Sequence, residues 1–343
     1  MIPIVAVAQE HSIYYFKDYA PYMRFDLPLI KFSESEQAIW TQMKDFAPDD
    51  DASFIDATER LFAIREGGTQ VSALTSELIS FEDINQQKAF FNLKRNAALI
   101  HKNFITCLGK INKSLDEEKC PQMLIVGTEH QQMILLEPNG QKVKVEVALK
   151  SVPVFILADG QFDVDYRIFL ACRDGRVYIY RAGKISDHEI GIESKPVGLV
   201  KFEKSILIAG MDCTLQSFYL KGKKNWSITM PAEICTITKM EHSRAASKNN
   251  VLVALKNGTI RLYNEKNLIN EVTTEDTCNG LVYGIFGRED GCMVINHQSG
   301  GMQAKILQRQ ANLSVSTVKA GAPPEQDIPL KVPQKTTLFV ELT

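Results

Sequence analysis

The feature that most constrains the fold of this 343-residue chain is a repeated strand–turn–strand pattern. Each copy has an apolar run that ends in a small residue, then a polar turn, then an alternating strand. Five copies begin at residues 123, 168, 206, 251 and 292, and a sixth begins at Ile4. The last five are spaced by roughly 42 residues, a period typical of four-stranded propeller blades. The pattern therefore predicts an all-β propeller, an architecture more often a scaffold than an enzyme.

Each hairpin is flanked by one apolar strand before it and one more polar strand after it. Polarity that rises outward in this way is expected when the first strand of a blade lines the crowded centre of a propeller. Five full blades are predicted within residues 97–331, and residues 1–32 supply three strands of another, which gives about six blades. A last strand within residues 332–343 is predicted to complete the first blade and close the ring. The ring is then either six-bladed or continued by blade material upstream.

Residues 33–96 interrupt the β pattern and predict an inserted helical segment. Ser33 and Glu36 form a capping box, and apolar residues at helical spacing predict three helices, the second ending at Gly67. This insertion is too long for a passive connection. It is either a helical hairpin packed on the propeller or a docking surface for another subunit. The large aromatic residues that favour docking, because their exposure is costly, are Trp40, Phe90 and Phe91.

The composition argues against several classes of ligand and location. The 39 basic and 41 acidic residues leave a net charge of −2, which gives no electrostatic reason to bind nucleic acid or an anionic membrane directly. The seven cysteines are scattered without a paired spacing, which favours a reducing compartment. The chain has no apolar run of membrane-spanning length and no signal peptide at its start, so we expect a soluble intracellular protein.

Motifs that carry chemistry are missing from the sequence. It contains no phosphate-binding glycine loop, no zinc-protease motif, no nucleophile elbow and no calcium-binding loop. The dipeptides Asp159-Gly160, Asp174-Gly175 and Asn257-Gly258 are interpreted as hairpin turns, because Asn, Asp and Gly tolerate positive φ. Glu289 and Asp290 are either a charged turn or a pair of carboxylates. We expect no enzyme activity, no cofactor and no metal.

The order of several segments is more specific than the repeat. IPIVAVA and PYMRFDLP precede the insertion, and VGTEHQQMILLEP, MPAEI, NGTIRLY, YGIFGRED and PLKVPQKTTLFV follow it. This order resembles the family of Bardet–Biedl syndrome protein 1, the propeller-bearing first subunit of the BBSome, over essentially the whole chain. The resemblance implies a seven-bladed propeller of which this chain lacks parts at both ends.

The resemblance also implies a function. The BBSome is a coat and cargo adaptor that moves membrane proteins through cilia with intraflagellar transport, and a GTP-loaded Arf-like small GTPase binds the first and last blades of this subunit. Expected partners are therefore other BBSome subunits, that GTPase and the cytoplasmic tails of ciliary cargo, with the membrane reached only through the coat. Expected locations are the cytoplasm, basal body and cilium. An alternative is a propeller scaffold of another coat or signalling complex. From position and charge, the partner-binding residues predicted in the last blade are Arg288, Glu289, Asp290, Gln298, Lys305 and Arg309.

Overall fold

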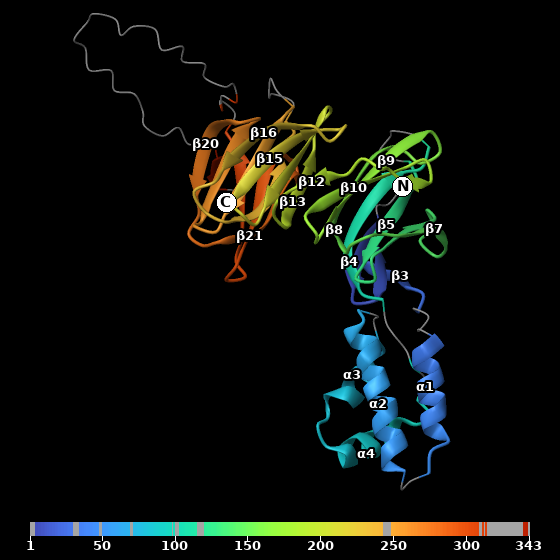
Figure 1. Ribbon diagram of the computed structural model, residues 1–343. Helices are drawn as coiled ribbons and strands as arrows, with labels where there is room; N and C mark the ends of the chain where they lie inside the picture. The colour runs from blue at the N-terminus through green and yellow to red at the C-terminus, as the bar shows by residue number, and fades with distance from the viewer. Residues whose placement is uncertain are drawn as a thin grey trace, which may run out of the picture. The chain divides into compact units, whose positions relative to one another are not determined.

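The computed structural model describes residues 4–29, 34–47, 50–68, 71–97, 99, 103–114, 120–242, 248–308, 311, 313 and 339–341 (Figure 1). The chain divides into two compact units, residues 1–105 and 106–343, and each is described by itself. The described part of the first unit holds a small sheet and four helices, and the second is built almost entirely of strands.

The second unit consists of successive groups of strands, and in each group most strands pair with the next strand along the chain. The first group is β4 (Ile105–Asn112), β5 (Gln122–Thr128), β6 (Gln132–Leu136) and β7 (Val143–Ala148). The second is β8 (Pro153–Gln161), β9 (Asp165–Cys172), β10 (Arg176–Arg181), β11 (Lys184–Ile185) and β12 (Ile190–Gly191), the last two both pairing with β10. A parallel pairing of Asn112 with Gln161 joins these two groups.

The described residues continue with three separate sheets of four strands each. One is β13 (Pro196–Lys201), β14 (Ser205–Gly210), β15 (Thr214–Tyr219) and β16 (Lys224–Thr229). The next is β17 (Ile234–Lys239), β18 (Asn250–Leu255), β19 (Thr259–Asn264) and β20 (Asn267–Thr273). The last is β21 (Cys278–Phe286), β22 (Glu289–His297), β23 (Met302–Leu307) and β24 (Phe339–Glu341).

The core of the second unit lies between consecutive sheets. In β18, Leu252 and Ala254 pack against the sheet that follows, whereas Val251 and Val253 pack against the sheet that precedes it. Side chains alternate between the two faces of a strand, so a strand buried on both faces must be apolar at every position. This explains why the repeated phrase begins with an uninterrupted apolar run instead of an alternating one.

The C-terminal strand corrects one expectation. β24 pairs antiparallel with β23, with Ile306 opposite Val340, and so forms the outer strand of the last sheet. Its described residues extend the last sheet, whereas the ring closure expected of residues 332–343 places this strand in the first blade. Residues 314–338, which precede β24, lie outside the described part of the chain.

Two of the three expected glycine turns are confirmed and the third is wrong. Gly175 and Gly258 lie in hairpin turns with φ of +76° and +78°. Gly160 instead lies within β8, paired with Tyr166, although its φ is also positive, at +84°. The neighbouring Asp159 forms an ion pair with Lys201, in which Lys201 Nζ lies 2.6 Å from Asp159 Oδ1.

Gly160→Ala is expected to lower the free energy of unfolding by about 2–3 kcal/mol, because a Cβ there adds a clash to the strain of positive φ. The new Cβ would stand 2.2 Å from the backbone oxygen of Asp165. Gly183→Ala is the matched control, since Gly183 has φ of +82° and no atom within 4 Å of a Cβ position. Urea denaturation of both variants separates the clash from the φ strain, and equal losses would contradict the clash.

The first unit begins with a three-stranded antiparallel sheet. Its strands are β1 (Ile4–Gln9), β2 (Ser12–Lys17) and β3 (Ala20–Asp26), at the positions that the sequence predicts. Ser12 Oγ donates to Asp26 Oδ1 at 2.6 Å, and Arg24 Nε donates to the same oxygen at 2.7 Å. These bonds connect the end of β3 to the start of β2.

Four helices follow in the described residues: α1 (Glu34–Lys44), α2 (Asp51–Glu66), α3 (Ala73–Ser80) and α4 (Ile84–Lys94). The sequence predicts only three, because α3 has eight residues, too few to show a clear helical period. α2 ends at Gly67, as expected, where the backbone N–H donates to Ala63 O. The helices share one buried cluster, whose members include Ile39, Met43, Phe54, Leu61 and Leu78.

Candidate interaction surface

The hairpin between β21 and β22 presents apolar and charged side chains together. The two strands pair from Cys278 opposite His297 to Phe286 opposite Glu289, and the turn Gly287–Arg288 joins them. The tip of this hairpin, coloured orange-red, extends beyond the neighbouring strands in Figure 1. We call Ile285, Phe286, Arg288, Glu289 and Asp290 the hairpin tip.

The apolar part of the hairpin tip is exposed beside a bulge. Gly284 lies opposite Cys292 and Phe286 lies opposite Glu289, so the extra residue is in β22, at Asp290 or Gly291. An extra residue disrupts the ladder locally, and on the opposite strand Ile285 and Phe286 are 77% and 45% exposed. Adjacent apolar side chains exposed at a protruding tip are the kind of anchor that protein interfaces bury at their centre.

The charged part of the hairpin tip is available to a partner. Arg288, Glu289 and Asp290 are exposed, and in the described part of the chain no ion pair engages any of them. Charged residues that surround an apolar centre form the polar rim of a typical interface. Three of the six predicted partner-binding residues therefore lie together, beside two apolar residues that the sequence analysis missed.

The other three predicted residues do not join the hairpin tip. Gln298 follows β22 at the opposite end of the sheet, eight residues from Asp290, or about 26 Å along the strand. Lys305 lies within β23, opposite Met293, and is half-buried. Arg309 lies outside the described residues. The six residues are predicted in one blade, but this shared position in the sequence does not bring all of them to one surface.

The aromatic residues predicted for subunit docking form the core of the helical segment instead. Trp40, Phe90 and Phe91 are buried in the cluster shared by the four helices. The ring centroids of Trp40 and Phe91 are 5.3 Å apart, and Phe54 meets Phe91 edge to face at 5.8 Å. Neighbouring helices cover these three side chains, so the exposure on which their docking expectation rests is not found.

A buried polar network in the same cluster was also missed. The Glu36 carboxylate is fully buried and accepts hydrogen bonds from the backbone N of Ser72, at 3.0 Å, and from Thr75 Oγ1. Trp40 Nε1 donates to the same Thr75 hydroxyl at 2.7 Å. Glu36 therefore ties α1 to the start of α3. Ser33, its expected capping partner, lies outside the described residues.

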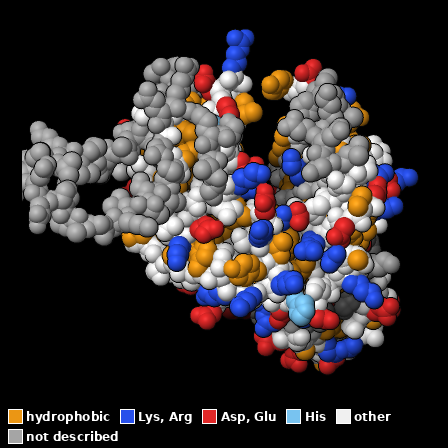
Figure 2. Space-filling view, turned by 90° about the horizontal axis from the view of Figure 1, so that it is seen from above, with side chains coloured by type: hydrophobic (Ala, Val, Ile, Leu, Met, Phe, Trp, Pro, Cys, Tyr) orange, Lys and Arg blue, Asp and Glu red, His pale blue; other side chains and the backbone are white. Residues whose placement is uncertain are grey.

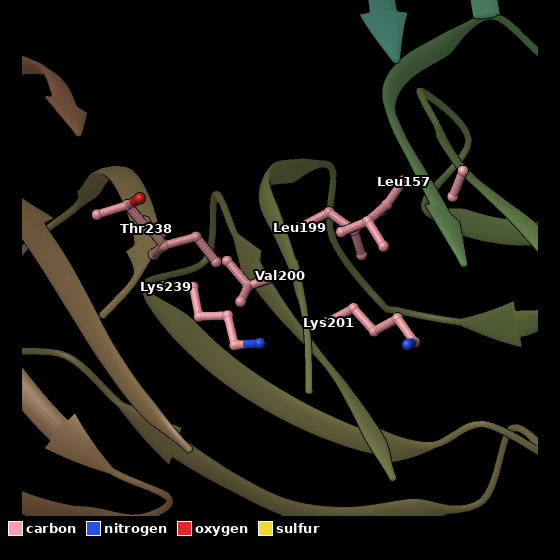
Figure 3. Close-up of a pocket in the computed structure, with 8 residues that line it drawn as sticks. Leu157, Leu199, Val200, Lys201, Thr238 and Lys239 are labelled. Atoms are coloured by element: carbon pink, nitrogen blue, oxygen red, sulfur yellow. The ribbon is translucent and has the colours of Figure 1, made fainter. Parts of the chain in front are cut away.

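A shallow groove of about 420 Å³ is lined by residues of β8, β13 and β17 (Figure 3). Five of its eight lining residues are apolar, and these include Leu157, Leu199 and Ile237. Two amines border it, but Lys201 is paired with Asp159 and Lys239 with Glu241. The amines are thus neutralised by carboxylates, and the apolar strands predicted for the centre of the propeller line this groove.

The described residues also include cysteines whose thiol pKa values are raised by burial. None of the seven cysteines, all of which are described, forms a disulfide, and burial raises the pKa of Cys107 to about 11 and that of Cys172 to about 12, so both thiols stay protonated near neutral pH. On the face drawn in Figure 2, basic and acidic side chains are interspersed. The described residues contain no metal-binding group of three His, Cys, Asp or Glu side chains. No helix in the described ranges is long and apolar enough to cross a membrane.

A family model and two curated proteins similar to this chain agree on one family. The family model "Ciliary BBSome complex subunit 1" matches residues 1–181. BBSome complex member BBS1 of Homo sapiens is 33% identical over 343 residues, and that of Mus musculus is 33% identical over 342 residues. Each alignment covers 99% of this chain and 57% of the relative, so the chain spans little more than half the length of these curated relatives.

Solved structures show the same likeness. The BBS1N chain in "Crystal structure of BBS1N in complex with ARL6DN, soaked with mercury" has a TM-score of 0.70 and 28% identity, covering 91% of this chain and 76% of that one. A chain of "Crystal Structure of Mitotic Checkpoint Complex" has a TM-score of 0.52 and 12% identity, covering 90% of this chain and 71% of that one. The second likeness concerns the fold alone. The mostly-β structure is thus similar to the BBS1N propeller, with four helices in its described residues.

Proposed function

The chain belongs to the family of ciliary BBSome complex subunit 1, whose model covers more than half of it, and we propose that it is a non-catalytic subunit of the BBSome. In this role it forms part of a coat that selects ciliary membrane proteins for transport. Its neighbours are other BBSome subunits and the cytoplasmic tails of cargo, and its locations are the cytoplasm, the basal body and the coat on the ciliary membrane. The strand groups of the second unit are five blades of its propeller, and β1–β3 are part of another.

The proposed partner of the propeller is a GTP-loaded Arf-like GTPase. The observation that carries this proposal is the TM-score of 0.70 to BBS1N, which was crystallised with ARL6. The hairpin tip is the contact that we propose on this chain, because it combines an exposed apolar pair with free charges of both signs. A contact of this kind can distinguish the two nucleotide states if it meets the switch segments of the GTPase, since these segments are ordered by the γ-phosphate.

The test is the affinity of this chain for ARL6 loaded with a non-hydrolysable GTP analogue or with GDP, measured by calorimetry. The matched domain of human BBS1 serves as the positive control. We expect binding at least tenfold tighter in the GTP state, or about 1.4 kcal/mol. Equal affinity for both states, or no binding by a folded chain when the human domain binds, would contradict an effector role.

The double substitution Ile285→Ser with Phe286→Ser is expected to weaken the GTP-state affinity at least tenfold. The serine side chains bury much less apolar surface in the complex than Ile and Phe do. Gln298→Ala is the control, since Gln298 is exposed at the opposite end of the same sheet. It is expected to change the affinity by less than about twofold. If Gln298→Ala weakens binding and the double variant does not, the contact lies at the other end of the sheet.

A further inference from the structure

Helix α2 has a second face that the helical core does not use. Phe54, Ala57 and Leu61 point into the buried cluster. Ile55 and Phe62 lie on a different face and are 44% and 46% exposed. Seven residues separate them, which is two helical turns or about 10.5 Å, so their side chains lie one above the other.

Acidic residues accompany this apolar pair. Glu59 and Glu66 follow Ile55 and Phe62 by four residues each, which places all four on one strip of the helix. We call Ile55, Glu59, Phe62 and Glu66 the α2 strip. Within the described ranges, no ion pair includes Glu59 or Glu66.

The neighbouring carboxylates differ in this respect. Asp56 Oδ2 lies 3.6 Å from Arg60 Nη1, and Asp51 forms an ion pair with Lys88. Their charges are therefore compensated within the helical segment, whereas those of Glu59 and Glu66 are not. The α2 strip is thus apolar and negatively charged at once.

We propose that the α2 strip is a docking surface for an amphipathic helix of a partner protein that carries Lys or Arg beside its apolar residues. Two apolar side chains spaced by two turns match the spacing of anchors on a partner helix packed along α2. Glu59 and Glu66 lie where cationic side chains of that helix would flank the anchors. The same negative charges repel anionic lipid and nucleic acid, so a protein helix is the occupant that the charge favours.

The test uses three fluorescent peptides of about 18 residues, a length that covers α2. One is an amphipathic Leu/Lys helix, the second has every Lys replaced by Glu, and the third is the Leu/Lys peptide with two central prolines that prevent a helix. Binding to the full chain is measured by anisotropy at physiological salt. We expect the Leu/Lys helix to bind at least tenfold more tightly than either of the others.

Three variants locate the contact. Ile55→Ser with Phe62→Ser, and separately Glu59→Lys with Glu66→Lys, are expected to weaken binding of the Leu/Lys helix at least tenfold. Leu93→Ser is the matched control, because Leu93 is also strongly exposed but lies on α4. It is expected to leave affinity within twofold, and circular dichroism checks that each variant keeps its helices. The proposal is overturned if Leu93→Ser weakens binding as much as the strip variants, or if the proline peptide binds as well as the helix.

Discussion

Phe169→Ala is expected to lower the free energy of unfolding of the second unit by about 3–5 kcal/mol, the range found when a buried Phe is truncated. Phe169 is fully buried in β9, in the cluster that joins its strand group to the sheet β13–β16. Ile206, Ile208 and Phe218 contribute to this cluster from the other side. The cavity left by this substitution therefore weakens the packing between two consecutive strand groups. It does not weaken the pairing of strands within a group.

The two tryptophans of the chain allow this measurement to be assigned to one unit. Trp226 lies in β16 of the second unit, and Trp40 lies in the helical segment of the first. In a Trp40→Phe background, tryptophan fluorescence in urea reports unfolding around Trp226 alone. Phe286→Ala is the matched control, since Phe286 is about half exposed, and we expect a loss below about 1 kcal/mol. Similar losses for both substitutions would mean that the sheets do not share the core described above.

Glu36→Ala is expected to lower the free energy of unfolding of the helical segment by about 2–4 kcal/mol, because a buried N–H of Ser72 and the Thr75 hydroxyl lose their charged acceptor. Helix propensity favours alanine, so a loss of stability must come from the network and not from the helix itself. The effect is measured as faster amide hydrogen exchange in α1 and α3, with β13–β20 unchanged.

Two further substitutions sharpen this result. Glu36→Gln keeps the shape of the side chain and one acceptor oxygen, so we expect a smaller loss than for alanine. Glu34→Ala removes an exposed carboxylate from the same helix and should have little effect. If Glu34→Ala and Glu36→Ala are equally mild, the network adds nothing to the stability of the segment.

The hairpin tip contains three residues whose exposure could be predicted from the sequence and two whose exposure could not. Arg288, Glu289 and Asp290 could be predicted as exposed, because they form a run of charges between two apolar segments, although Glu289 and Asp290 begin β22 and do not lie in the turn. The exposure of Ile285 and Phe286 could not, since alternation predicts that one of two adjacent residues points inward. The hairpin tip extends beyond the neighbouring strands, so neither side chain is buried in a core, and local alternation carries no signal for how far a hairpin extends.

The sequence by itself determined the period of the β units, the positions of most strands and the place of the helical segment. These depend on local alternation and on turn residues, which act over fewer than about ten positions. The tertiary structure alone decided that β24 pairs with β23, that Trp40, Phe90 and Phe91 are core residues, and that Glu36 binds Ser72 and Thr75. Each of these depends on which distant segments meet, and an aromatic or acidic residue has the same letter in a core as on a surface. Long-range packing selects between those environments because burial is worth more than local propensity.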